Sequence, residues 1–165
     1  MSCSIIDINQ MDKREFVARL GAVFEETPAI AEQTWAARPF SDISALHSQM
    51  VAVVEKMSGF EQLDLIRAHP ELAARSPMAE ASVQEQASTG LNQLSPQEYE
   101  RFQSLNSAYK EKFGFPFVMA VKGHDKNSIL AMFGQRLENG KEEERARSLA
   151  EIHKIARFRL EDLID

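Results

Sequence analysis

The amino-acid sequence predicts an all-α fold, a bundle of about six to eight helices in a single domain that spans residues 1–165. Apolar residues recur at intervals of three and four through most of the chain, which is the spacing of one helical face. Capping-box patterns, in which Ser or Asp is followed three residues later by Glu, precede several of these runs. Only one short extended segment, near Phe115–Val121, competes with the helical pattern, and no repeat or linker divides the chain.

Four helices are predicted in the first part of the chain, separated by short breaks at proline or glycine. The first begins at the capping box of Asp12 and Glu15, and the third begins at Ser41. A second capping box, of Ser58 and Glu61, precedes the fourth. These helices are Met11–Glu26, Ala29–Ala37, the apolar stripe from Ile43 to Met57, and a short helix that follows Ser58-Gly59 and runs into His69-Pro70.

The remainder of the chain carries further start and stop signals. Ser95, Pro96 and Glu98 supply a cap, a proline at the first helical position and a glutamate at the third, which predicts a helix as far as Lys112. The other predicted helices are 79–89, closed by Gly90, a helix through Ile129 and Leu137 that ends at Gly140, and Lys141–Leu163.

Composition limits the classes of function. The chain has 165 residues, 44% hydrophobic and 27% charged, as in an ordinary globular protein. Its net charge of −6 argues against a nucleic-acid partner, which requires a basic face. We expect no membrane partner, because no window approaches the ~18 consecutive apolar residues of a membrane span. The lone cysteine, Cys3, and an N-terminus without signal-peptide character predict a cytoplasmic protein.

His69 lies at a predicted break in the chain. Because proline disfavours helical geometry in the residue before it, His69-Pro70 is expected to follow a helix rather than to lie within one. A histidine there can hydrogen-bond the last carbonyl groups of the helix and interact with its dipole. It can also act near neutral pH as a group that orients or transfers a proton. The residue pattern alone leaves both interpretations open.

Ser82, Glu85 and Gln86 share one helical face, because they are spaced i, i+3 and i+4. Ser82 and Glu85 also match a capping box, so Ser82 could simply begin the helix. Gln86 is not explained by capping. Val83 and Ala87 are expected to pack against the protein on a neighbouring face, which would leave the polar face directed into a cleft for a small polar substrate.

An arginine occupies the apolar stripe of the last predicted helix. This stripe consists of Ile152, Ala156, Arg159 and Leu163. Arg159 could snorkel, with its stem packed and its guanidinium in water. Alternatively, its guanidinium could point into a pocket and hold a carboxylate or ureido oxygen by bidentate hydrogen bonds.

One interpretation of the extended segment is that it fills the core, but its backbone also needs hydrogen-bond partners. Without a partner strand, its backbone N–H and C=O groups need other partners. A planar heterocycle with amide-like edges could use these groups as a neighbouring strand would. No metal site is predicted, since none of His47, His124 and His153 has another ligand at a suitable spacing.

Four separated motifs together resemble the family of 2-oxo-4-hydroxy-4-carboxy-5-ureidoimidazoline (OHCU) decarboxylases of urate degradation. The resemblance extends over nearly the whole chain. The motifs are Ala68-His69-Pro70-Glu71-Leu72-Ala73; Ser82-x-x-Glu85-Gln86 with Gly90-Leu91; Leu105-Asn106-x-x-Tyr109-x-x-x-Phe113-Gly114-Phe115-Pro116-Phe117-Val118; and Ile155-Ala156-x-Phe158-Arg159-Leu160.

The resemblance implies an all-α homodimer that needs no cofactor and converts OHCU to (S)-allantoin. It also implies roles for individual residues. His69 resembles the catalytic histidine, and Glu85 would orient it or promote its charge. The implied substrate pocket contains Pro70, Ser82, Val83, Gln84, Glu85, Gln86 and Arg159, together with the backbone of Phe117, Val118, Met119, Ala120 and Val121. The competing interpretation is a non-catalytic helical module that binds a small molecule or another protein.

Overall fold

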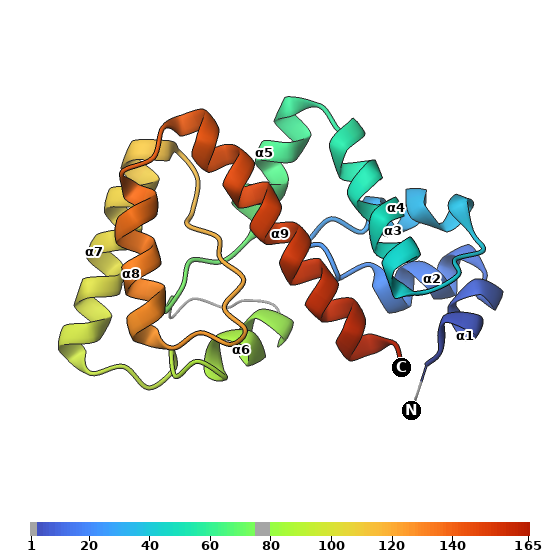
Figure 1. Ribbon diagram of the computed structural model, residues 1–165, viewed down its shortest axis with the longest axis horizontal. Coiled ribbons are helices and arrows are strands. Elements are labelled where there is room, and N and C mark those ends of the chain that lie inside the picture. The colour runs from blue at the N-terminus through green and yellow to red at the C-terminus, as the bar shows by residue number, and fades with distance from the viewer. Residues whose placement is uncertain (1–2, 75–79) are drawn as a thin grey trace. The chain divides into compact units, whose positions relative to one another are not determined.

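The computed structural model describes residues 3–74 and 80–165, and over these residues the chain is all α-helix without a β-strand (Figure 1). The predicted fold class is therefore confirmed. None of the described helices is both long enough and apolar enough to cross a membrane. The chain divides into two compact units, Met1–Ala68 with His153–Asp165, and His69–Ile152. The single domain inferred from the sequence stays a prediction.

In the first unit, the described residues form five α-helices, a single 3₁₀ turn and the end of the last helix. The helix α1, which begins with a capping box between Ser4 and Asp7, was not predicted from the sequence. The elements are α1 (Ile5–Gln10), α2 (Lys13–Leu20), α3 (Ala29–Thr34), the 3₁₀ turn η1 (Trp35–Ala37), α4 (Ile43–Lys56), α5 (Gly59–Ala68) and the final residues of α9 (Lys141–Leu163).

Two predicted helix limits in this unit need correction. The helix predicted to reach Glu26 ends at Leu20. Beyond it, the carbonyl oxygens of Ala22 and Val23 accept hydrogen bonds from Arg159 Nη1 at 3.3 and 3.4 Å. A side chain that is distant in sequence thus satisfies backbone groups that helical bonds would otherwise use.

The N-cap of α4 is Asp42 rather than Ser41, because the Asp42 carboxylate accepts the backbone N–H of Ala45 at 2.7 Å. The predicted start is therefore wrong by one residue. The capping boxes expected at Asp12 and at Ser58 are both confirmed.

The second unit is built from α6 (Glu80–Ala87), α7 (Pro96–Phe113), α8 (Lys126–Leu137) and the first part of α9. In Figure 1, α7 and α8 run side by side and are joined by a long non-helical connection. The connection begins at Gly114, whose φ of 80° is the left-handed conformation that glycine adopts without strain. Phe115–Val121 follows and is buried throughout.

Aromatic side chains fill the core of this unit. The rings of Phe117 and Phe133 stack with centroids 3.8 Å apart, and the ring of Tyr109 meets the edge or face of both. Tyr109 comes from α7, Phe133 from α8, and Phe117 from the connection between them. The apolar content of the connection therefore serves packing in addition to any role in binding.

Replacing Ser95 by alanine removes the side-chain acceptor that caps α7 through the N–H of Glu98. We expect Ser95→Ala to lower the free energy of unfolding by about 1 kcal/mol. The matched control is Ser104→Ala on the exposed surface of the same helix, where alanine should be neutral or slightly stabilising. Urea denaturation of both variants measures the difference, and equal stabilities would contradict the capping role.

Candidate active site

His69 is the residue that immediately follows α5, which ends at Ala68. The predicted break before Pro70 is therefore confirmed. The histidine is buried, with a relative exposure of 6%, whereas Pro70 is half-buried. An imidazole in this position is well shielded from bulk water.

The loop after His69 is held by the side chain of Gln86 on α6. Gln86 Oε1 accepts the backbone N–H of Ala73 at 2.9 Å. Its Nε2 donates to the carbonyl oxygen of Glu71 at 3.4 Å. The amide of Gln86 therefore positions the backbone next to His69, and each of its ends retains the capacity for one further hydrogen bond.

Two amide side chains of α7 hold the same loop. Asn106 Nδ2 donates to the carbonyl oxygen of Leu72 at 2.9 Å, and Gln103 Nε2 donates to that of Ala73 at 3.3 Å. Ala73 has a φ of 60°, a left-handed conformation that costs a non-glycine residue about 1 kcal/mol or more. The amide contacts stabilise a strained backbone directly beyond His69.

The polar face of α6 points into the protein. Ser82 and Gln86 are buried, and Glu85 is half-buried. Because α6 begins at Glu80, Ser82 lies inside the helix, and the interpretation of Ser82 as its first cap is wrong. Gln84 is exposed, and so is Val83, at 49%. The expectation that Val83 packs against this chain is therefore wrong, because the buried side of the helix is the polar one.

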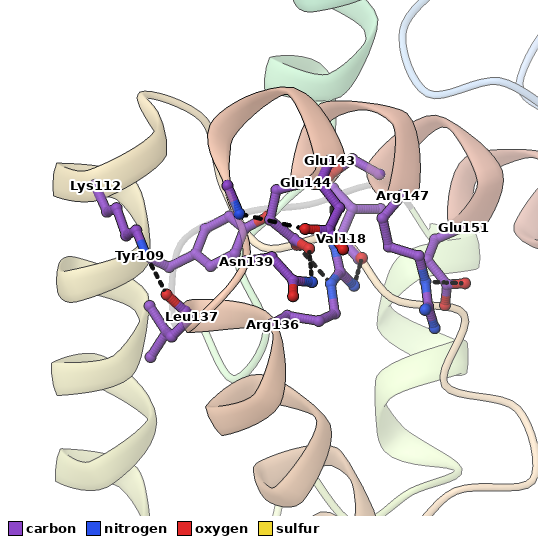
Figure 2. A network of polar contacts seen from close by, with 12 residues as sticks. Tyr109, Lys112, Val118, Arg136, Leu137, Asn139, Glu143, Glu144, Arg147 and Glu151 are labelled. Atoms are coloured by element: carbon purple, nitrogen blue, oxygen red, sulfur yellow. Dashed lines mark hydrogen bonds and ion pairs between the residues drawn. The ribbon is translucent and has the colours of Figure 1, made fainter.

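Among the described residues, the extended segment finds backbone partners in side chains rather than in a second strand, and Figure 2 shows one of them, Arg136, at Val118. The carbonyl oxygen of Val118 accepts a hydrogen bond from Arg136 Nη1 at 2.6 Å. The backbone N–H of Ala120 donates to Glu151 Oε1 at 3.1 Å. Arg136 lies on α8 and Glu151 on α9, so both helices hold the segment.

Arg136 belongs to a buried ionic cluster. Arg136 Nε donates to Glu144 Oε1 at 2.6 Å, and the two side chains are 1% and 0% exposed. The hydroxyl of Tyr109 donates to the same carboxylate oxygen at 2.6 Å. Burial, followed by the hydrogen bond to Glu144, raises the pKa of Tyr109, so the phenol keeps the proton that it donates.

Arg136 was not predicted as a site residue, although the sequence contains a signal for it. Ile129, Phe133 and Arg136 follow the spacing of a buried helical stripe, and arginine occupies an apolar position there. The same signal did identify Arg159. Glu144, Glu151 and Asn106 carry no comparable local signal, since their partners lie far away in the sequence.

Arg159 lies in the first unit, and its guanidinium is buried. Arg159 Nη2 donates to Glu25 Oε1 at 3.1 Å, and the two side chains are 6% and 3% exposed. The snorkelling alternative is therefore wrong. Glu25, which sequence analysis missed, and the carbonyl groups described above fix the orientation of this planar donor.

The structure thus brings Gln86 to the loop after His69 and encloses Phe117–Val121 within the same unit. The convergence of His69, Glu85 and Arg159 on one substrate stays a prediction. Among the described residues, no group of three or more His, Cys, Asp and Glu side chains is arranged to hold a metal ion.

Comparison with known proteins decides the family. The family model described as OHCU decarboxylase matches residues 9–161. The chain belongs to the OHCU decarboxylase family. It is 44% identical to 2-oxo-4-hydroxy-4-carboxy-5-ureidoimidazoline decarboxylase of Halalkalicoccus jeotgali over 97% of this chain and 91% of that protein. It is 35% identical to the decarboxylase of the same name from Mus musculus, over 97% of this chain and 92% of that protein.

Solved structures agree with the family membership. The chain resembles the crystal structure of an (S)-allantoin synthase with a TM-score of 0.80 and 32% identity. That match covers 99% of this chain and 54% of the synthase, so this chain spans about half of its length. An OHCU decarboxylase crystallised in the presence of (S)-allantoin shares the fold, with a TM-score of 0.71 and 21% identity, over 93% of this chain and 98% of that chain.

Removing the Asn106 amide leaves the carbonyl group of Leu72 without its side-chain donor. Because an unsatisfied buried polar group costs about 1–3 kcal/mol, we expect Asn106→Ala to lower the free energy of unfolding by that amount. Ser107→Ala, at the next and exposed position of α7, is the matched control and should change stability by less than about 0.5 kcal/mol. Chemical denaturation tests this, and similar stabilities would show that the loop does not depend on Asn106.

Proposed function

We propose that this chain decarboxylates OHCU to (S)-allantoin, with His69 and Glu85 as its catalytic residues. Family membership makes the chain a carboxy-lyase of urate degradation. The match to the family over nearly the whole chain carries the proposal, because it includes all four motifs that contain the site residues.

The substrate itself supplies most of the chemistry. Its carboxylate is attached to a ring carbon that also bears a hydroxyl group and adjoins conjugated C=O and C=N groups. When the C–CO₂⁻ bond breaks, the electron pair enters this conjugated system and CO₂ leaves, so no cofactor is needed as an electron acceptor. The hydroxyl group then loses its proton and becomes a carbonyl group of allantoin, and a proton adds to one face of the adjacent ring carbon, which bears the ureido group. The protein must fix the pose and direct that proton.

His69 is the group proposed to handle the proton of the substrate hydroxyl or of the adjacent carbon. An imidazole can exchange a proton near neutral pH, and a carboxylate beside it can orient the ring or favour its charged form. The half-buried carboxylate of Glu85 has this role in the proposal. The amide-held backbone after His69 supports it, because a fixed loop limits the movement of the histidine.

Arg159 and Gln86 are proposed to hold the ureido or carbonyl groups of the substrate. The guanidinium is already oriented by Glu25, which lowers the entropy lost when it binds a planar oxygen pair. The remaining proposed contacts are Pro70, Ser82, Val83 and Gln84, and the backbone from Phe117 to Val121. Val83 and Gln84 are exposed in the single chain, so they are the weakest of these contacts.

We also propose that the protein is a cytoplasmic homodimer and that the chain forms one domain. The dimer and the single domain rest on the resemblance to the family. The lone cysteine fits a reducing compartment. Light scattering on the purified chain tests the dimer directly, and a mass equal to that of one chain would contradict it.

Substituting His69 should separate catalysis from folding. We expect His69→Asn to lower kcat for OHCU by at least about 10²-fold, because it removes the proposed proton-transfer group. OHCU is generated from urate by urate oxidase and a hydroxyisourate hydrolase. Loss of ultraviolet absorbance and the circular dichroism of allantoin then report rate and stereochemistry.

The matched control for this variant is His124→Asn, which changes a half-buried histidine on the turn before α8. It should retain wild-type turnover. A His69→Asn protein that forms (S)-allantoin at the wild-type rate would exclude His69 as the catalytic group. If the wild type itself fails to accelerate the loss of OHCU, the proposed function is wrong.

A further inference from the structure

The extended segment is tethered at two backbone groups by side chains of opposite charge. Arg136 donates to the carbonyl oxygen of Val118 (Figure 2), and Glu151 accepts the N–H of Ala120. In an extended chain the backbone groups of residues i and i+2 point to the same edge. The two tethers therefore occupy one edge of the segment.

The residue between the tethers is turned the other way. Met119 directs its N–H and C=O to the opposite edge by the same alternation. Its side chain is buried, and no hydrogen bond within residues 3–74 and 80–165 involves its backbone. Val118 and Ala120 are thus each bonded to a side chain of the protein, whereas Met119 between them has a donor and an acceptor with no partner among the described residues.

The tethers are themselves rigid. Three groups surround the Arg136 guanidinium. Glu144 Oε1 lies 2.6 Å from Nε, Ser148 Oγ lies 3.4 Å from Nη2, and the centroid of the Phe117 ring lies 4.4 Å from Cζ. Glu151 Oε2 accepts from Arg147 Nε at 3.3 Å. A buried ion pair contributes little net stability, because desolvation of both charges offsets their attraction. What these charges do provide is a fixed direction for the bonds to the segment.

We propose that Arg136 and Glu151 are positioning residues, which hold one backbone edge of Phe117–Val121 so that the edge at Met119 can bind the substrate. The inference rests on the proposed function, since it assigns the substrate to the same segment. Neither side chain touches the substrate in this account. Their loss should weaken substrate binding and leave the proton-transfer step nearly unchanged.

Two variants of Glu151 test the tether at Ala120. Glu151→Met removes the acceptor at a similar side-chain volume, and KM for OHCU should rise about ten-fold, the equivalent of about 1.4 kcal/mol. Its kcat should stay within about three-fold of the wild-type value, because the catalytic groups are unchanged. Glu151→Gln keeps an oxygen that can accept the Ala120 N–H, so its KM should return close to the wild-type value.

The tether at Val118 is tested without leaving a buried charge unpaired. The double variant Arg136→Met with Glu144→Gln removes both charges of the ion pair, and its KM should also rise about ten-fold. Tyr109→Phe is the matched control. It deletes the hydrogen bond to Glu144 but leaves the tether intact, so it should lower Tm and leave KM unchanged.

The outcomes are distinct. A normal KM in folded Glu151→Met, or an equal rise in KM for the Met and Gln variants, would overturn the tether at Ala120.

If Glu151→Met does not fold, a normal KM in the double variant overturns the inference and a raised one upholds it. If both fail to fold, a raised KM in Glu151→Gln overturns it and a wild-type KM upholds it. Wild-type turnover in the same assay, together with its loss in His69→Asn, shows that the proposed function survives in each case.

Discussion

Buried backbone groups outside the helices must find hydrogen-bond partners, and this constraint organises the protein. The described residues form no β-strand, and side chains on the helices supply those partners. Amides of α6 and α7 hold the loop after His69, and charged groups of α8 and α9 hold the extended segment. An arginine of α9 satisfies carbonyl groups beyond α2.

The kind of partner differs with the segment that it holds. Neutral amides bind the loop at Glu71–Ala73, where they can donate and accept without the desolvation cost of a charge. Charged side chains bind Val118, Ala120 and the carbonyl groups beyond α2, where a charge on one partner strengthens the hydrogen bond. The helices therefore act as a frame, and the non-helical segments that carry most of the proposed site are held by it.

Local sequence patterns predicted the helices well, because caps act over a few residues. The capping boxes at Asp12, Ser58 and Ser95 begin helices as expected. The early end of α2 was not predictable from local patterns, because the carbonyl group of Ala22 beyond it bonds to Arg159, which lies 137 residues away in the sequence. The exposure of Val83 was missed because an apolar residue was assumed to mark the buried side of α6.

The candidate site was predicted in part. His69 and the segment Phe117–Val121 stood out through proline, glycine and a change of periodicity, which are local signals. The residues that hold these segments in place carry no such local signal. Asn106 looks like an ordinary helical residue, and the role of Glu151 depends on a backbone group 31 residues away. Arginine on an apolar stripe is the one long-range signal that sequence inspection can use, as Arg159 and Arg136 both show.

The most direct test of this account is amide hydrogen exchange of the wild-type protein, resolved by residue with NMR. The amides of Ala73 and Ala120 lie in non-helical segments but donate to buried side chains. The account predicts that both are protected to the same extent as the amide of Phe133 in the centre of α8. Exchange as fast as that of Gly123, in an exposed turn, would contradict it.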